Sequence, residues 1–141
     1  MNKVNISFAG LIDLAQPRLG TKIVFKTDEF FAPVKRMISP LSPIFKDGVF
    51  DRHGKWMDGW ETRRKRIKGH DYAILRLGKA GSISKVDIDT AYFVGNQPQL
   101  ASIEACSCKS LIPDMNIKWH KLIGKKKIIG NRHNIFTTKN K

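Results

Sequence analysis

Residues 54–66 read Gly-Lys-Trp-Met-Asp-Gly-Trp-Glu-Thr-Arg-Arg-Lys-Arg, which places two indoles, two carboxylates and four consecutive cations around one Asp-Gly turn. A purely structural turn seldom needs so many large or charged groups together. An anionic, nitrogen-rich small molecule would find cations for its charge, carboxylates for its N–H groups and aromatic faces for packing. The stretch therefore predicts a loop that takes part in binding a small molecule.

Short alternating segments punctuated by Gly and Pro lie on both sides of this stretch. Three prolines between residues 32 and 43 exclude a long regular helix there. The alternating segments predict strands within residues 22–26, 70–77, 83–93, 100–108 and 117–123. Several short strands with such turn residues are typical of an all-β fold, an antiparallel β-sandwich.

The composition limits the chain to one ordinary domain. It has 141 residues, of which 41% are hydrophobic, and a formal net charge of +14. Such a charge favours nucleic acid or another anionic surface. Much of it lies in the last quarter of the chain, so we expect a folded unit over residues 1–124 and a basic, loosely ordered end over residues 125–141. A nucleic-acid partner is not expected, because that lysine-rich end lacks interleaved aromatic residues for base stacking.

The two cysteines and the hydropathy pattern indicate a cytoplasmic protein. Cys106 and Cys108 are one residue apart, where a disulfide would be strained, so we expect two reduced thiols. No second Cys or His pair with zinc-like spacing follows, and neither a metal nor another cofactor is expected. No apolar run reaches the length of a membrane span, the N-terminus lacks a signal-peptide pattern, and no membrane association is expected.

Several motifs along the chain resemble those of the allantoicase family. The motifs are residues 27–33 (Thr-Asp-Glu-Phe-Phe-Ala-Pro), 54–64, 69–72 (Gly-His-Asp-Tyr), 76–78, 86–90 (Val-Asp-Ile-Asp-Thr), 93–96 (Phe-Val-Gly-Asn) and 102–105. Tyr92 stands where the family often has His, and Tyr72 where it has Trp. The resemblance covers the chain from about Asp13 to the end of the expected sandwich and is closest to the first of the family's two tandem repeats.

The resemblance implies both a fold and an activity. The fold would be a jelly-roll sandwich of the galactose-binding type. The activity would be hydrolysis of allantoate to ureidoglycolate and urea in purine breakdown, by a complete or partial form of the enzyme. The partner would be a second repeat or another copy of the chain. A non-catalytic jelly-roll module that binds a small anion or a sugar is the alternative.

The residues around the hallmark stretch suit allantoate, which carries one carboxylate and two ureido groups. Arg63 or Arg64 could hold the carboxylate with a two-pronged hydrogen bond. Asn96 offers a donor and an acceptor on one amide, which matches a ureido face. Trp60 and Thr90 complete the set of residues that we expect to contact the substrate.

Hydrolysis of the C–N bond needs a base and an acid that assists the leaving urea. A carboxylate or an imidazole is the natural candidate for either role. Glu61, His70 and Asp89 are therefore the predicted catalytic residues, although His70 could instead only orient the start of its strand.

Other polar residues have a structural interpretation. Asp58 and Thr62 are expected to shape the turn, and Trp56 to pack at its rim. Asp28 and Glu29 are loop carboxylates that could pair with the basic run.

The remaining histidines and strand carboxylates form no recognisable constellation in the sequence. Asp87 and Asp89 alternate with apolar residues, so we expect outward-facing carboxylates that are solvated or paired with Arg or Lys. The three histidines that we assign to the surface are His53, His120 and His133.

Overall fold

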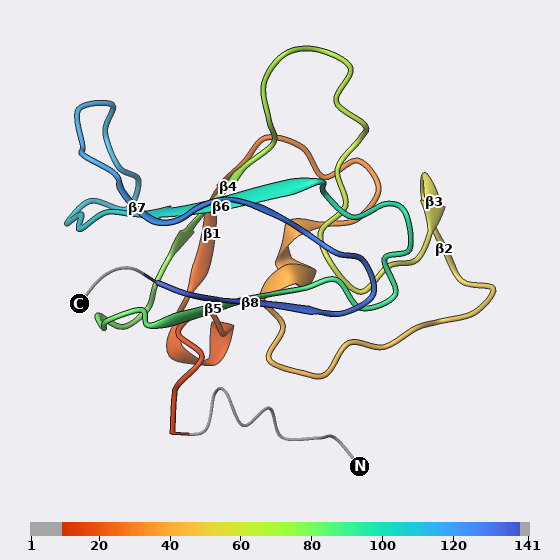
Figure 1. Ribbon diagram of the computed structural model, residues 1–141, viewed down its shortest axis with the longest axis horizontal. Coiled ribbons are helices and arrows are strands. Elements are labelled where there is room, and N and C mark those ends of the chain that lie inside the picture. The colour runs from red at the N-terminus through yellow and green to blue at the C-terminus, as the bar shows by residue number, and fades with distance from the viewer. Residues whose placement is uncertain (1–9, 139–141) are drawn as a thin grey trace.

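The fold is known from a computed structural model, which describes residues 10–138. Figure 1 shows short strands joined by long loops. The strands are β1 (Lys22–Lys26), β2 (Phe50–Asp51), β3 (Gly54–Lys55), β4 (Ala73–Arg76), β5 (Lys85–Asp89), β6 (Leu100–Ala105), β7 (His120–Lys127) and β8 (His133–Thr137). Two short 3-10 helices, η2 (Pro17–Leu19) and η3 (Val34–Ile38), accompany them.

All strand pairs in the described part of the chain are antiparallel. The pairs are β1–β4, β2–β3, β5–β8 and β6–β7. In Figure 1 the pairs β6–β7 and β5–β8 run roughly horizontally, whereas the pair β1–β4 runs from top to bottom. The predicted all-β antiparallel fold is confirmed, and the strand expected at residues 22–26 coincides with β1. The jelly-roll order of strands stays a prediction.

The segment with three prolines forms no long helix, as expected. Its regular part is η3, which begins after Pro33 and ends before Ser39. Val34 and Ile38 of this turn are buried. η3 therefore holds the following loop against the body of the protein.

The prediction of a loosely ordered end from residue 125 is wrong for residues 125–138. β7 continues through Lys127, and β8 pairs with β5 along its whole length. Leu122, Ile123 and Ile128 are buried, at 5%, 3% and 3% exposure, while the lysines between them remain exposed. The folded unit therefore does not end at residue 124. Residues 1–9 of the predicted unit and residues 139–141 of the predicted basic end lie outside the described residues.

A small apolar cluster lies beneath three loops. It consists of Ala32, Met57 and Phe93, each from a different loop. Gly59 packs against Phe93 so closely that a Cβ atom at Gly59 would lie 3.0 Å from Phe93 Cε2. Glycine at this turn therefore allows the three loops to meet.

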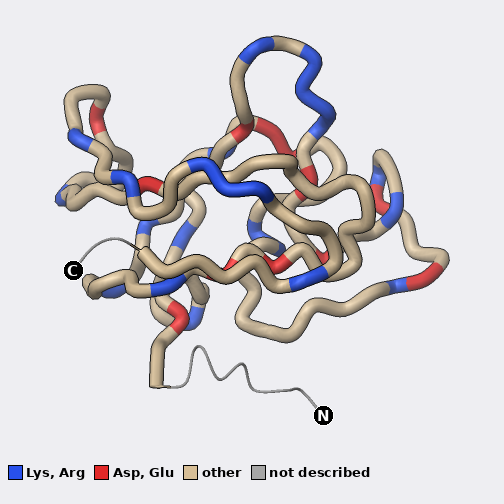
Figure 2. The backbone as a smooth tube through the Cα atoms, viewed as in Figure 1, with Lys and Arg blue, Asp and Glu red and all other residues tan. Residues whose placement is uncertain are grey.

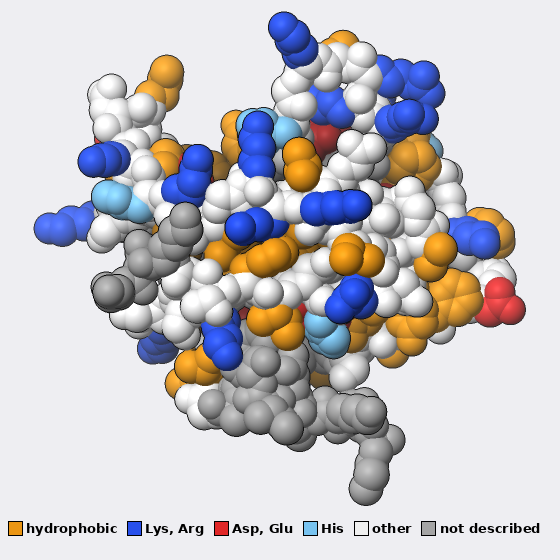
Figure 3. Space-filling model, in the orientation of Figure 1, with side chains coloured by type: hydrophobic (Ala, Val, Ile, Leu, Met, Phe, Trp, Pro, Cys, Tyr) orange, Lys and Arg blue, Asp and Glu red, His pale blue; other side chains and the backbone are white. Residues whose placement is uncertain are grey.

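Two exposed segments carry runs of basic residues. Figure 2 shows them along the loop of residues 63–68 and along β7 at Lys125–Lys127, and all of these side chains are exposed. Figure 3 shows apolar side chains between the basic ones on the face in view. Within residues 10–138, no helix has the length and apolar character needed to cross a membrane.

Candidate active site

The hallmark stretch lies directly against the loop that follows β1. Ala32 and Glu61 form an isolated antiparallel bridge, in which Ala32 N donates to Glu61 O at 3.1 Å and Glu61 N donates to Ala32 O at 3.2 Å. Phe31 N donates to the same Glu61 oxygen at 3.2 Å. Because neighbouring side chains alternate along an extended segment, Trp60 and Glu61 face opposite sides of this bridge.

Asp28 joins the two segments on the Trp60 side. Its Oδ2 atom accepts hydrogen bonds from Arg63 N at 2.7 Å and from Phe30 N at 3.1 Å. Its backbone oxygen accepts from Trp60 Nε1 at 2.7 Å, so the indole N–H is already used within the protein. Burial opposes the ionisation of Asp28, but these N–H groups and the charges of Arg63 and Lys65 hold its pKa below the usual value.

Glu61 meets Asn96 on the other side of the bridge. Asn96 Nδ2 donates to Glu61 Oε1 at 3.0 Å, and the two residues, called the site pair below, come from loops far apart in sequence. Both residues belong to the site predicted from the sequence. The pair leaves the second Glu61 oxygen and the Asn96 carbonyl oxygen available to a ligand, because each group has more bonding capacity than this contact uses.

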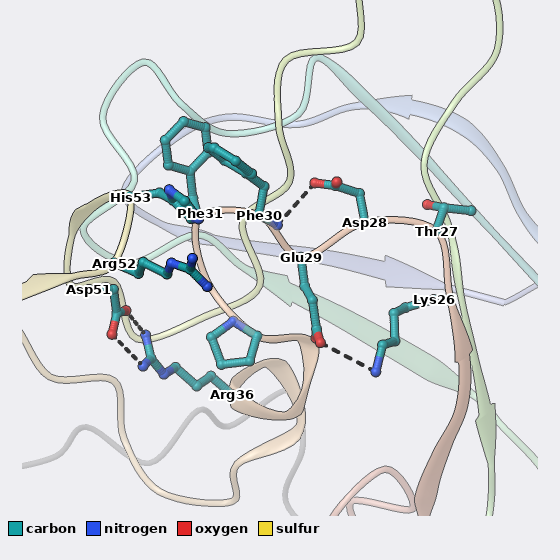
Figure 4. A pocket seen from close by; sticks show the side chains of 11 residues that line it. Lys26, Thr27, Asp28, Glu29, Phe30, Phe31, Arg36, Asp51, Arg52 and His53 are labelled. Atoms are coloured by element: carbon teal, nitrogen blue, oxygen red, sulfur yellow. Dashed lines mark hydrogen bonds and ion pairs between the residues drawn. The ribbon is translucent and has the colours of Figure 1, made fainter.

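An open groove of about 630 Å³ runs between the loop after β1 and the β2–β3 hairpin. Figure 4 shows its polar lining. Arg36 binds Asp51 through two hydrogen bonds of 2.6 and 3.2 Å, and Lys26 pairs with Glu29 at 3.3 Å. These two ion pairs neutralise most of the charge along the groove.

The same contacts lower the pKa values of two groove carboxylates. Hydrogen bonds from Arg36 hold the pKa of Asp51 below its usual value, although burial opposes the shift. The Val34 N–H group, which donates to Glu29 at 3.0 Å, does the same for Glu29, and Lys26 adds to the effect. Both carboxylates therefore stay ionised and bound to partners within the protein.

Arg52 and His53 line this groove from the tip of the β2–β3 hairpin. Within residues 10–138, Arg52 forms no hydrogen bond or ion pair, and in Figure 4 its guanidinium group lies among Phe31, Arg36 and Asp51. His53 stacks on Phe30 with a centroid distance of 3.9 Å, and Arg63 Cζ lies 4.3 Å from the centre of the same ring. His53 is exposed, as expected of a surface residue, and it also lines the groove.

Sequence reasoning did not identify Arg52, His53 or Phe30 as parts of the site. The hairpin that presents the first two has strands of only two residues, too short to leave an alternating pattern. Its Asp-Arg-His-Gly turn is the one local signal that could have indicated it.

Among residues 10–138, three other predicted residues form no hydrogen bond with the site pair. Thr90 is 4% exposed, and its hydroxyl donates to Ile129 O at 2.6 Å and lies 3.0 Å from Arg132 O, so it braces the interior and does not face the groove. His70 is exposed, with its ring 5.9 Å from that of Tyr72. Arg64 is exposed and, within residues 10–138, has no hydrogen bond or ion pair.

Asp89 belongs to a second polar group, which links β5 to β8. His133 Nδ1 lies 2.6 Å from Asp87 Oδ2 and 3.8 Å from Asp89 Oδ2. We call Asp87, Asp89 and His133 the cross-strand cluster. The predictions that Asp87 is solvated or bound to Lys or Arg, and that His133 belongs to no constellation, are wrong. The strand register places His133 directly opposite Asp89.

Burial shapes the electrostatics of the cross-strand cluster. Desolvation raises the pKa of Asp87, although the hydrogen bond with His133 opposes the shift, and its Oδ1 atom is buried without a hydrogen-bond partner. The hydrogen bond with Asp87 raises the pKa of His133, against a smaller effect of burial. Within residues 10–138, no group of three or more His, Cys, Asp or Glu side chains has a geometry that could hold a metal ion.

Asp58 and Trp56 have the structural roles expected of them. Asp58 Oδ2 accepts a hydrogen bond from Ile44 N at 2.9 Å, which ties the turn to the preceding loop. The Trp56 ring lies 4.9 Å from Arg36 Cζ and 4.4 Å from Lys46 Nζ. Both residues therefore hold neighbouring segments in place.

The fold and these loops define an antiparallel β-sandwich whose loops carry a polar groove and a carboxylate–amide pair. The chain belongs to the allantoicase family, whose repeat matches residues 12–141. It is 47% identical over 133 residues to a probable allantoicase of Pseudomonas paraeruginosa and 50% identical over 126 residues to one of Pseudomonas savastanoi pv. phaseolicola. These alignments cover 94% and 89% of this chain but 40% and 38% of the relatives.

Solved structures give the same result. A structure of allantoicase superposes with a TM-score of 0.78 at 30% identity, and the crystal structure of allantoicase from Saccharomyces cerevisiae with 0.73 at 29%. Each match covers 91% of this chain and 39% of the other. The chain thus spans about two fifths of the length of its allantoicase relatives.

Proposed function

We propose that this chain takes part in an allantoicase reaction, the hydrolysis of allantoate to ureidoglycolate and urea. The observation that carries the proposal is the hydrogen bond between Glu61 and Asn96, which brings an acid–base group and a ureido-matching amide together in an allantoicase repeat. In this reaction the bond between the central carbon and one ureido nitrogen breaks. The oxygen of water bonds to that carbon, and the leaving urea takes a proton.

Glu61 has the features of the group that moves the proton. It is half-buried at the bridge to Ala32, which fixes its backbone, and Asn96 holds one of its carboxylate oxygens. The other oxygen can accept a proton from water and return it to the leaving nitrogen. A positioned carboxylate in this role contributes about 10² to 10⁴ in rate.

Arg52 and Arg63 are the proposed partners of the substrate carboxylate. The Arg52 side chain lies in the groove without an internal partner among residues 10–138, and Arg63 lies over Phe30 at the groove's edge. A guanidinium group can bind a carboxylate through two parallel hydrogen bonds, which a lysine cannot match. The ion pairs beside Arg52 already use the charges of their members, so Arg52 is left to bind the carboxylate of the substrate.

A non-catalytic module that binds a small anion or a sugar is the second candidate. The wide opening of the groove favours it, because an open site leaves the reacting groups in contact with water. A second repeat or another copy of the chain could cover the opening, and we propose one of these as the partner of the catalytic form.

Urea release from allantoate by the purified chain tests the proposal. Turnover that is lost in Glu61→Gln but kept in Lys79→Gln, a charge change on an exposed loop, would support it. Saturable protection of the chain by allantoate against thermal unfolding, without any urea release, would leave the binding module. A chain that shows no urea release and no protection by allantoate would overturn both candidates.

A further inference from the structure

The turn between β7 and β8, residues 128–132, contacts the loop that carries Asn96. We infer that Gly130 and Asn131 are positioning residues, which hold this loop so that Asn96 reaches Glu61. The inference rests on the proposed function, because it concerns the geometry of the proposed catalytic pair. Among residues 10–138, no hydrogen bond joins either residue to the pair itself.

Asn131 fixes the start of the loop. Its backbone N donates to Thr90 O at 3.0 Å, and its Oδ1 atom accepts from Tyr92 N at 2.9 Å. Tyr92 and Asn131 both have positive φ angles, 67° and 53°. A tyrosine rarely adopts this conformation, whereas asparagine tolerates it, so the side chain of Asn131 stabilises the strained turn at Tyr92.

Gly130 leaves the space in which the rest of the loop packs. A Cβ atom at Gly130 would lie 2.6 Å from Phe93 O and 2.7 Å from Gln97 Oε1. That Gln97 oxygen accepts a hydrogen bond from Gly95 N at 2.9 Å. Asn96 lies between Gly95 and Gln97, inside the turn that this hydrogen bond closes. Because Gln97 packs directly against Gly130, the position of Asn96 depends on the space at Gly130.

The turn is rigid enough to act as a support because buried Asn134 holds it. Asn134 Oδ1 accepts from Ile129 N at 2.9 Å, and its Nδ2 atom donates to Ile129 O at 3.0 Å. The same nitrogen lies 3.0 Å from Ile88 O in β5. Asn134 is 7% exposed, so the support is anchored in the interior.

The first test is Gly130→Ala with Gly124→Ala as its matched control. Gly124 lies in β7, where an added Cβ would meet only Lys121 Cδ at 3.9 Å. We expect Gly130→Ala to lower kcat/KM by about 100-fold, the cost of misplacing a catalytic group by about 1 Å. Gly124→Ala should retain the wild-type value.

A double-mutant cycle shows whether Gly130 acts through Asn96. In an Asn96→Ala background, Gly130→Ala should cause little further loss of kcat/KM, because the group that it positions is absent. An equal loss in both backgrounds would overturn the inference.

The Asn131 series separates the hydrogen bond from the backbone conformation. Asn131→Asp keeps an acceptor and tolerates positive φ, so it should preserve kcat/KM. Asn131→Gly keeps the backbone conformation but loses the acceptor, so it should lower kcat/KM about 10-fold or more. Equal values for the two variants would contradict the role assigned to the side chain.

NMR of the Asn96 side-chain amide gives a readout that does not depend on turnover. Gly130→Ala should move this signal to its position in Glu61→Ala, where the acceptor is missing, and Gly124→Ala should leave it in place. An unchanged signal in folded Gly130→Ala would overturn the inference. If the wild type releases no urea, the proposed function fails while this experiment still decides the positioning.

Discussion

The site pair and the cross-strand cluster use the same chemistry in different settings. In each, a carboxylate meets a nitrogen-bearing side chain that is distant in sequence. Glu61 and Asn96 come from two loops, and the Glu61 backbone is bonded to Phe31 of the groove lining, whereas His133 and the two aspartates come from adjacent paired strands. Loops leave bonding capacity facing a ligand, while the strand pairing aims polar groups at one another. The first arrangement suits recognition, and the second holds two strands together.

The largest difference between the two regions should appear in catalysis. We expect Glu61→Gln to lower kcat for urea release by about 10² to 10⁴, because the amide cannot accept a proton. His133→Gln should leave kcat unchanged. Steady-state assays on both variants, with circular dichroism to show that each is folded, measure the contrast. A loss of kcat in His133→Gln as large as that in Glu61→Gln would move the catalytic role to the cross-strand cluster.

Substrate binding should distinguish the groove arginine from the sequence-predicted one. Arg52→Gln removes a charged hydrogen-bond donor, worth about 1.5–3 kcal/mol, so KM for allantoate should rise at least about 10-fold with little change in kcat. Arg64→Gln should have a smaller effect, since Arg64 is outside the groove lining. The opposite ranking would favour the assignment made from sequence.

Thr90 lies between the two regions and should matter for stability. Thr90→Val keeps the shape but removes the hydroxyl that bonds Ile129 O and Arg132 O. Asn134 Nδ2 also donates to both carbonyl oxygens, so neither is left without a partner, and the loss of the hydroxyl's hydrogen bond should lower the free energy of unfolding by about 0.5–1.5 kcal/mol. Urea denaturation measures the loss, and Thr90→Ser, which keeps the hydroxyl, should recover most of it. A fully stable Thr90→Val would show that Thr90 is free for another role.

The smallest effect should be a pH dependence of stability from the cross-strand cluster. His133 has a raised pKa in the folded state, so its stabilising effect is complete below its unfolded pKa of about 6.5 and is lost as pH rises through the folded pKa. The side chain is 58% exposed, so solvent screening keeps this contribution below about 1 kcal/mol.

Melting temperatures at pH 6 and pH 8 test this effect. The wild type should lose more stability than His133→Gln over that interval, because the variant lacks the titrating group. The raised pKa of Asp87 acts in the same direction at lower pH. Equal losses in the two proteins would mean that the cluster does not bind protons more tightly on folding.

The strands and the hallmark loop could be predicted because their signals are local. Alternation and turn residues located β1, β4, β5 and β6, and the motif led to Glu61 and Asn96. The strand predicted within residues 117–123 overlaps the start of β7, but the rest of β7 and all of β8 were not predicted. β7 ends in three consecutive lysines, which interrupt any alternation of apolar residues. β8 buries the polar residue Asn134, and a search for buried apolar positions does not detect such a residue.

The two regions also differ in how visible their partners are in the sequence. Asp87 and His133 meet only because β5 pairs with β8, and no local pattern indicates that register. Arg52 reaches the groove because a very short hairpin turns toward the loop after β1. Such contacts depend on tertiary geometry, which residue spacing alone does not contain.

The pairing of β5 with β8 has a consequence for synthesis of the chain. A ribosome makes β5 before its partner, which emerges only after all of β6 and β7. Until then β5 exposes an unpaired edge, which invites association with other nascent chains. The cell must protect that edge for the interval, so we expect folding yield to respond to translation rate and chaperone supply more than in a protein whose neighbouring strands pair in order.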